Sequence, residues 1–152
     1  ILADHVVEAR VLDLFAGTGG VGIEALSRGA ARAVFVERAP KALSIIRTNL
    51  RRTHLASRAQ VVRADVFKFL SAQPEPFDLV YIAPPQYLGL WSRALRLLDG
   101  TPEWLSPDGL VVVQIFPKEY EALALSTLEL VDQRKYGSTQ LCFYELGSTT
   151  NR

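Results

Sequence analysis

The sequence predicts an α/β domain built on a mostly parallel sheet of seven strands, with helices on both faces and an antiparallel hairpin at one end. Short apolar runs alternate with amphipathic helical segments, which is the pattern of βαβ units and of a sheet covered on both faces. The last two strand-like runs have no helical segment between them, so they predict the hairpin. The length of 152 residues, 49% hydrophobic and 22% charged, suits one domain over residues 1–152.

The predicted strands are short runs of aliphatic and aromatic residues that end near glycine, proline or a charged residue. They lie at residues 11–15, 33–37, 60–64, 77–82, 110–116, 128–134 and 139–146. Residues 105–109 predict a turn before the fifth strand, and residues 136–138 predict the turn of the final hairpin. Cys142 is expected to be a small core residue in an edge strand.

The helical segments are predicted at residues 21–28, 40–53, 66–70 and 88–98. Gly29 ends the first of them, and Pro40 begins the second at a position where its missing N–H costs nothing. Apolar residues repeat along one face of the second helix, as a surface helix of a globular protein requires. Trp91 and Trp104 are expected to be packing anchors.

Composition excludes several classes of protein. The single cysteine cannot form an internal disulfide, and no apolar run is long enough to span a bilayer. With no signal peptide in the sequence, these features predict a cytoplasmic protein. We separately expect a monomer. Two histidines and one cysteine without clustering predict no metal site. The chain contains no methionine, so we expect a segment to be missing before Ile1.

A glycine-rich turn follows the first predicted strand. Glycines allow a backbone to approach a ligand closely, and the helix N-terminus that follows favours a carboxylate. Asp13 would attract an ammonium group, directly or through water. S-adenosylmethionine carries both charges, although a tight turn without function is the alternative. The residues predicted to bind it here are Asp13, Phe15, Ala16, Gly17, Thr18 and Gly19.

Acids also follow the second and third strands. Glu37, beside Arg38, is placed to accept hydrogen bonds from ribose hydroxyls, and this feature alone also suits NAD or a solvated strand end. Asp65 is placed to accept from an adenine amino group, and the backbone of Val66 to donate to the ring. Taken alone, Asp65 reads as an ordinary helix N-cap. Three acids at three successive strand ends are more specific than any one of them.

A double-proline corner follows the fourth strand, as Ala83-Pro84-Pro85-Gln86-Tyr87. Two prolines fix a rigid corner without N–H donors, so that their carbonyls can accept from an amino group. An aromatic residue beside such a corner can stack on a flat base. A plain turn with a buried Tyr87 is the alternative interpretation.

Together these motifs resemble the RsmD-type family of S-adenosylmethionine-dependent methyltransferases. The resemblance lies in residues 11–26, 36–38, 62–65 and 134–139, the last being Arg-Lys-Tyr-Gly-Ser-Thr. It implies a Rossmann-like class I methyltransferase fold and S-adenosylmethionine as the cofactor. It also implies methylation of the N2 amino group of a guanine in small-subunit (16S) ribosomal RNA. The implied partner is ribosomal RNA or a small ribosomal subunit particle, with no membrane and no metal.

The corner departs from the family pattern. The family has Asp or Asn where this chain has Ala83, and that side chain is expected to hold the guanine amino group. Here the Pro84 carbonyl or the Gln86 side chain would have to replace it. Either Gln86 or Tyr87 occupies the aromatic position, and we assign the stacking role to Tyr87. A further basic segment precedes the first strand in the family, and it would lie upstream of Ile1.

Three other functions remain open. The chain could methylate DNA, protein or a small molecule, or bind S-adenosylmethionine or RNA without catalysis because of Ala83. An NAD dehydrogenase is disfavoured: Gly17, Gly19 and Gly22 match its glycine spacing, but Asp13 and Asp65 would then have no purpose. We expect His54 to lie at the surface. Candidate phosphate contacts, or simply solvated side chains, are Arg47, Arg51, Arg52, Arg58, Arg93, Arg96, Arg134 and Lys135.

Overall fold

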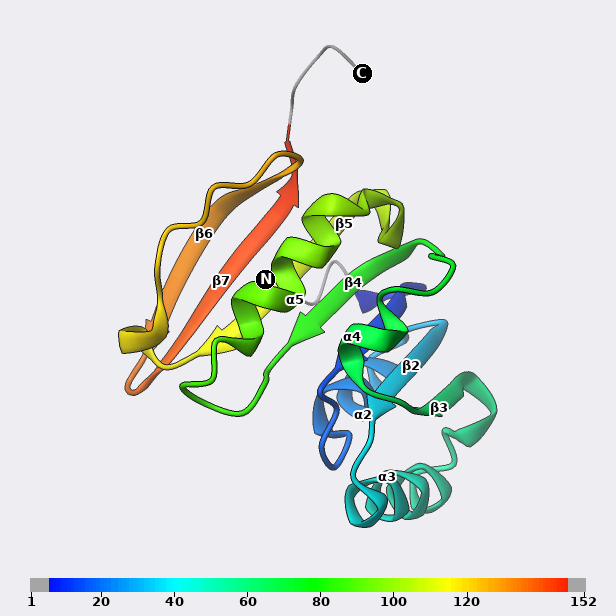
Figure 1. The fold of residues 1–152 in the computed structure, drawn as a ribbon. Helices are drawn as coiled ribbons and strands as arrows, with labels where there is room; N and C mark the ends of the chain where they lie inside the picture. The colour runs from blue at the N-terminus through cyan, green and yellow to red at the C-terminus, as the bar shows by residue number, and fades with distance from the viewer. Residues whose placement is uncertain (1–5, 148–152) are drawn as a thin grey trace.

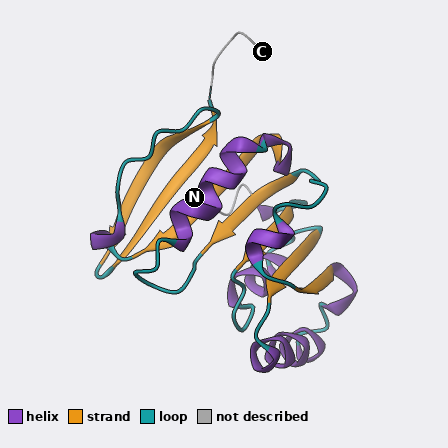
Figure 2. Ribbon diagram, viewed as in Figure 1, coloured by secondary structure: helices purple, strands orange, loops and turns teal. Residues whose placement is uncertain are grey.

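A computed structural model describes residues 6–147 of the chain as one sheet with helices packed against it (Figures 1 and 2). The strands are β1 (Arg10–Leu14), β2 (Arg32–Glu37), β3 (Ala59–Arg63), β4 (Phe77–Ile82), β5 (Leu105–Ile115), β6 (Leu128–Tyr136) and β7 (Thr139–Leu146). The helices are α2 (Gly20–Ser27), α3 (Pro40–Arg52), α4 (Val66–Phe69) and α5 (Leu90–Gly100), with short 3-10 turns η1 (Ala56–Arg58), η2 (Pro102–Trp104) and η3 (Pro117–Glu119).

The sheet order is β3-β2-β1-β4-β5-β7-β6. The first five strands pair in parallel, and β7 pairs antiparallel with both β5 and β6. The predicted fold class is therefore confirmed, including the seven strands and the terminal hairpin. The chain reverses its direction of travel across the sheet after β3, so that β4 lies beside β1. In such an open sheet a ligand binds at the carboxyl ends of the strands beside this switch point.

Two sequence predictions about the last strands are wrong. The predicted turn at residues 105–109 lies inside β5, because the sheet absorbs the extra residues as a register shift opposite Asp78. Cys142 is buried as expected, but β7 lies between β5 and β6 and is not an edge strand. The edge is β6, which is longer than predicted and has a bulge between Leu130 and Asp132.

The core occupies both faces of the sheet. One cluster packs beneath α4 and α5, on the near side in Figure 1, and includes the predicted anchors Trp91 and Trp104. The second lies beneath α2 and α3 and includes Phe35 and Ile46. Both tryptophans are almost fully buried. Among residues 6–147, no helix has the length and apolar content needed to cross a membrane.

Helix α2 approaches the sheet closely because of Gly22. A Cβ at this position would lie 2.3 Å from Cε2 of Phe35, whose side chain is fully buried in β2. The backbone N–H of Gly22 also donates to Asp13 Oδ2 at 3.2 Å. The missing side chain therefore sets the spacing between α2 and the sheet, and with it the place where α2 begins.

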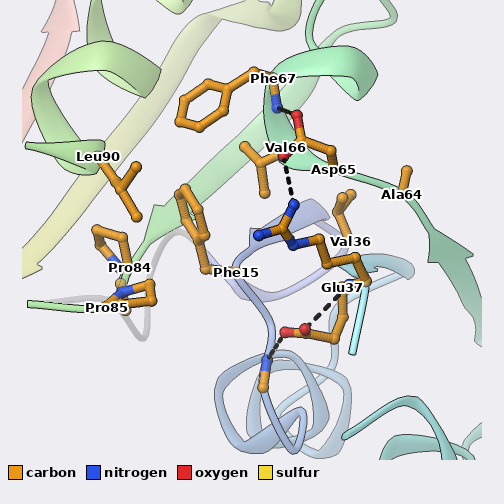
Figure 3. A pocket seen from close by; sticks show the side chains of 13 residues that line it. Phe15, Val36, Glu37, Ala64, Asp65, Val66, Phe67, Pro84, Pro85 and Leu90 are labelled. Carbon is orange, nitrogen blue, oxygen red and sulfur yellow. Dashed lines mark hydrogen bonds and ion pairs between the residues drawn. The ribbon is translucent and has the colours of Figure 1, made fainter. Parts of the chain in front are cut away.

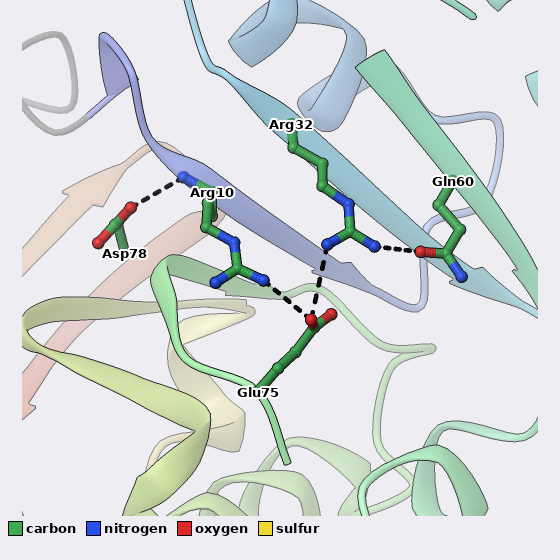
Figure 4. A network of polar contacts seen from close by, with 5 residues as sticks. All are labelled: Arg10, Arg32, Gln60, Glu75 and Asp78. Carbon is green, nitrogen blue, oxygen red and sulfur yellow. Dashed lines mark hydrogen bonds and ion pairs between the residues drawn. The ribbon is translucent and has the colours of Figure 1, made fainter. Parts of the chain in front are cut away.

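A polar network joins the amino ends of the strands, on the side of the sheet opposite the cavity end (Figure 4). Glu75 accepts from Arg10 at 2.8 Å and lies 3.5 Å from a guanidinium nitrogen of Arg32. Arg32 also donates to Gln60, and the Arg10 backbone N–H donates to Asp78 Oδ2 at 2.9 Å. These contacts join β1, β2, β3 and β4 without occupying the edge where a ligand is expected.

The terminal hairpin is attached to α5 through Asp99. Its carboxylate accepts from the backbone N–H groups of Ser126, Thr127 and Leu128 at 2.8–3.1 Å. Burial alone would raise the pKa of Asp99, but these hydrogen bonds outweigh it and lower the pKa below its ordinary value. The buried carboxylate thereby fixes where β6 starts.

We predict that Gly22→Ala lowers the free energy of unfolding by about 1–3 kcal/mol, because the buried Phe35 ring has nowhere to move. Denaturation in urea measures the change. Gly20→Ala is the matched control on the same helix, since no atom lies within 4 Å of the added carbon. Equal stability of the two variants would contradict the close approach.

Candidate functional site

The carboxyl ends of β1, β2, β3 and β4 surround one cavity of about 420 Å³ (Figure 3). Most of the predicted cofactor and corner residues meet here, although they are spread over more than 70 positions of the sequence. The lining residues are Phe15, Gly17, Val36, Glu37, Arg38, Ala64, Asp65, Val66, Phe67, Ala83, Pro84, Pro85 and Leu90.

The turn after β1 forms one wall with an unusual backbone. Phe15, Gly17 and Gly19 all have positive φ, at 58°, 58° and 85°. Such a conformation strains a non-glycine residue such as Phe15 and is often found at functional sites. Phe15 and Gly17 line the cavity, whereas Ala16, Thr18 and Gly19 do not.

Glu37 joins this turn to the turn after β2. Its Oε1 accepts from the Gly17 N–H at 2.8 Å, and its Oε2 accepts from the N–H groups of Arg38 and Ala39 at 3.0 and 2.9 Å. A carboxylate offers about four lone-pair sites, so roughly one, on Oε1, stays available. Glu37 is thus both a strut between two turns and an acceptor that faces the cavity.

Asp65 caps α4. Its Oδ2 accepts from the N–H groups of Phe67 and Lys68, each at 3.1 Å, which confirms the helix-cap interpretation. Its Oδ1 lies 3.7 Å from a guanidinium nitrogen of Arg38, a largely exposed pair of little energetic value. The cap uses Oδ2, so Oδ1, near Arg38, still has lone pairs on the cavity side, with the Val66 and Phe67 side chains beside it (Figure 3).

Asp13 lies beneath the glycine turn rather than in the cavity wall. Its relative exposure is 2%, and its hydrogen bond is the one from the Gly22 N–H. Burial raises the pKa of Asp13 to about 8; the Glu37 charge adds to the rise and the Gly22 bond opposes it. A carboxyl that keeps its proton to about pH 8 is neutral near pH 7, so the predicted attraction for an ammonium group requires that the bound cation lowers this pKa, and it stays a prediction.

The double-proline corner separates the first cavity from a second one of about 280 Å³. Ala83 and Pro84 line both cavities, Pro85 lines the first and Gln86 the second. The other residues of the second cavity are Gln114, Ile115, Phe116, Glu119 and Thr139. In its wall Tyr81 donates a hydrogen bond to the Gln114 side-chain oxygen.

Tyr87 lies outside both cavities. The side chain is 61% exposed, and its ring centroid lies 5.5 Å from that of Phe116 at a tilt of 36°. The alternative in which Tyr87 is buried in a plain turn is therefore wrong. Stacking of Tyr87 on the base that the corner holds stays a prediction. The Phe116 ring beside Tyr87 lines the second cavity together with Ala83 and Pro84, whereas Tyr87 does not line it.

The candidate phosphate contacts fall into different environments. Arg58 is occupied: it donates to the carbonyls of Ala30 and Leu26 at the end of α2, so it is a structural residue. Arg93 lies 3.8 Å above the Phe67 ring, and Arg134 pairs with Asp132 at 3.0 Å. Besides Arg93, the exposed members of the set are Arg47, Arg51, Arg52, Arg96 and Lys135, and His54 is exposed as expected.

Sequence reasoning missed the second cavity. Its one available signal was Gln114, a polar residue near the end of the apolar run 110–115 that forms the second half of β5. Phe116 and Glu119 gave no comparable signal, because their role depends on how the chain turns after β5. Within residues 6–147 no group of three or more His, Cys, Asp or Glu side chains is arranged to hold a metal ion.

Comparison with known proteins gives one consistent result. The family model described as Conserved hypothetical protein 95 matches residues 1–145. YlbH of Bacillus subtilis is 38% identical over 141 residues, which cover 90% of this chain and 75% of that protein. Ribosomal RNA small subunit methyltransferase D of Escherichia coli is 36% identical over 113 residues, covering 74% of this chain and 56% of that protein.

A similar fold occurs in a crystal structure of an RNA methyltransferase from Salinibacter ruber in complex with S-adenosyl-L-homocysteine. It superposes with a TM-score of 0.74 at 20% identity, over 97% of this chain and 87% of the other. At this identity the likeness shows the fold, which is that of a Rossmann-like class I methyltransferase.

We predict that Asp13 makes stability fall as pH rises. The unfolded chain loses this proton near pH 3.9, whereas the folded chain keeps it to about pH 8, so ionisation favours unfolding between those values. The unfolding free energy of the wild type minus that of Asp13→Asn should drop by up to about 4 kcal/mol from pH 5 to pH 8. Urea denaturation at both pH values measures it. The exposed Asp108→Asn serves as control, and a flat difference for Asp13→Asn would refute the assignment.

Proposed function

The chain belongs to the family described as Conserved hypothetical protein 95, the RsmD family, and from this premise we propose that it methylates the N2 amino group of a guanine in small-subunit ribosomal RNA. S-adenosylmethionine is the cofactor of this class of enzyme. The coarser activity, methylation of ribosomal RNA, is supported by the names of the relatives and by family membership. The choice of guanine N2 rests on the resemblance of the motifs.

The first cavity is proposed to hold the cofactor. Its volume of about 420 Å³ lies within the range of small-molecule sites. Glu37 would accept from a ribose hydroxyl through the free site on Oε1. Asp65 would accept from the adenine amino group through Oδ1, beside the apolar walls of Val66 and Phe67. The carboxylate end would lie at the Gly17 wall of the cavity, on the side from which the chain enters α2.

The second cavity is proposed to hold the acceptor base. The observation that carries this assignment is that the two cavities meet at Ala83 and Pro84. A base in the second cavity would present its amino group at the corner, toward the sulfonium end of the first. The Pro84 carbonyl would accept one of the amino hydrogens.

The chemistry asks mainly for placement. The cofactor supplies an activated methyl group, so the chain needs no metal and no covalent nucleophile. Holding nitrogen, methyl carbon and sulfur in line is worth up to about 7–11 kcal/mol in well-oriented systems. Carbonyl and amide oxygens near the nitrogen stabilise the positive charge that develops on it. An exposed amino edge requires an unstacked base, hence a loop or an extruded nucleotide in the RNA.

Gln114 is proposed to replace the side chain that Ala83 lacks. The hydrogen bond from Tyr81 fixes the amide on the wall of the second cavity, next to the corner. A neutral amide makes weaker hydrogen bonds than a carboxylate. Ala83 is also the observation that favours a second candidate, a domain that binds the cofactor and RNA without transferring a methyl group.

Methyl transfer from labelled S-adenosylmethionine tests the proposal. With 16S ribosomal RNA and with small-subunit particles as acceptors, we expect label in one guanine as N2-methylguanosine, mapped by nuclease digestion and mass spectrometry. Gln114→Ala should lower kcat, with little effect on cofactor binding. Label in another base would reject the guanine assignment, and cofactor binding without transfer would favour the non-catalytic candidate.

We also expect Glu37→Ala to weaken binding of S-adenosylhomocysteine by about 1.5–3 kcal/mol, since a hydrogen bond to a charged acceptor is lost and the Gly17 turn is released. Isothermal titration calorimetry measures it. Glu129→Gln, an exposed acid on β6, is the control and should leave affinity unchanged. Full affinity of Glu37→Ala would move the cofactor away from this cavity.

A further inference from the structure

A third hollow lies on the surface beside the second cavity. Tyr87, Phe116, Pro117, Lys118 and Ser138 line it, and its volume is about 420 Å³. We call it the Tyr87 hollow. It is an open surface feature made by the loop between β4 and α5, the segment that follows β5 and begins η3, and the turn of the terminal hairpin. Phe116 lines both this hollow and the second cavity, so the two are neighbours.

One carboxylate builds the aromatic floor of the hollow. Glu119 Oε1 accepts from the Tyr87 N–H at 2.8 Å, and Glu119 Oε2 accepts from the Phe116 N–H at 3.0 Å. Both rings are therefore held through their own backbones, from segments about 30 positions apart in the sequence. Tyr87 also has a φ of 60°, a strained conformation for a residue other than glycine.

This construction leaves a large aromatic side chain in solvent at a fixed position. An exposed, rigidly mounted ring with a cation beside it is the arrangement by which proteins bind single-stranded nucleic acid: bases stack on the ring and phosphates meet the cation. Lys118 provides the cation and Ser138 a hydroxyl. The negative charge of Glu119 is partly compensated, because each of its oxygens accepts a backbone N–H.

We propose that the Tyr87 hollow is a subsite for an unpaired RNA nucleotide next to the one that is methylated. Its base stacks on Tyr87 and its phosphate contacts Lys118, while the target base enters the second cavity on the other side of Phe116. This inference rests on the proposed function, because it takes RNA as the substrate. Tyr87 thus stacks on the neighbouring nucleotide, while the double-proline corner binds the target base in the second cavity.

The test is binding of a fluorescently labelled pentaribonucleotide, UUGUU, measured by anisotropy, and of the same oligonucleotide with an abasic site on either side of the guanine. One abasic position should weaken binding to the wild type roughly 5- to 150-fold, the value of one stacked base. Tyr87→Ala should bind the intact oligonucleotide equally weakly and lose nothing more at the abasic one. Tyr87→Phe, which keeps the ring, should behave as the wild type.

Controls separate a subsite from general surface effects. Tyr136→Ala removes a tyrosine of similar exposure, 57%, outside the hollow and should leave binding unchanged. Glu119→Ala should weaken binding, whereas combining it with Tyr87→Ala should add little, as expected of a positioning residue. Lys118→Ala should reduce the slope of log affinity against log salt by about 0.7.

Several results would overturn the inference: equal abasic losses in the wild type and in Tyr87→Ala, an equal loss in Tyr136→Ala, or no binding of the oligonucleotide by the wild type. The methyl-transfer assay is independent of these outcomes. Transfer to 16S ribosomal RNA with no abasic effect keeps the activity and rejects the subsite. An abasic effect that depends on Tyr87, without transfer, keeps the subsite and rejects the activity.

Discussion

The site depends on one carboxylate. Glu37 accepts three backbone N–H groups from the turns that follow β1 and β2, and so fixes two walls of the first cavity relative to each other. The parallel register that sets Leu14 opposite Val36 brings the turns close, and the Ala16 N–H adds a backbone hydrogen bond to the Val36 carbonyl at 3.0 Å. Past that bond, the Glu37 side chain continues the connection between the two turns. The Glu37 carboxylate that holds these walls in place also has a lone pair available on the cavity side. The same side chain therefore sets the shape of the cavity and provides an acceptor inside it.

Features set by local periodicity were predictable. The seven strands followed from alternating apolar runs and helical segments. The acids Glu37, at the end of β2, and Asp65, after β3, were correctly expected at one edge of the sheet, because carboxyl ends of parallel strands meet there. Pro107 and Gly109 misled the prediction of β5. Such residues normally interrupt a strand. Here they lie in the first half of β5, where the pairing with β4 accommodates them as a bulge opposite Asp78.

Features set by distant partners were not predictable. Arg58 looked like a member of a basic surface cluster, but the carbonyls that occupy it lie about 30 positions earlier in the chain. Tyr87 takes its position from Glu119, and the burial of Asp13 follows from the absence of a side chain at Gly22. In each case the deciding contact joins residues that no local pattern connects.

Within residues 6–147, β6 is an edge strand with one row of backbone groups that no other strand pairs with, and such an edge can accept a strand from a second chain. Its sequence resists this. Charged residues recur along the strand, and the bulge between Leu130 and Asp132 interrupts the regular spacing that an incoming strand would need to match. The irregular edge thus disfavours fibre-like self-association of the folded protein at high concentration. Deleting one residue at the bulge, so that β6 becomes a regular strand, would remove this protection.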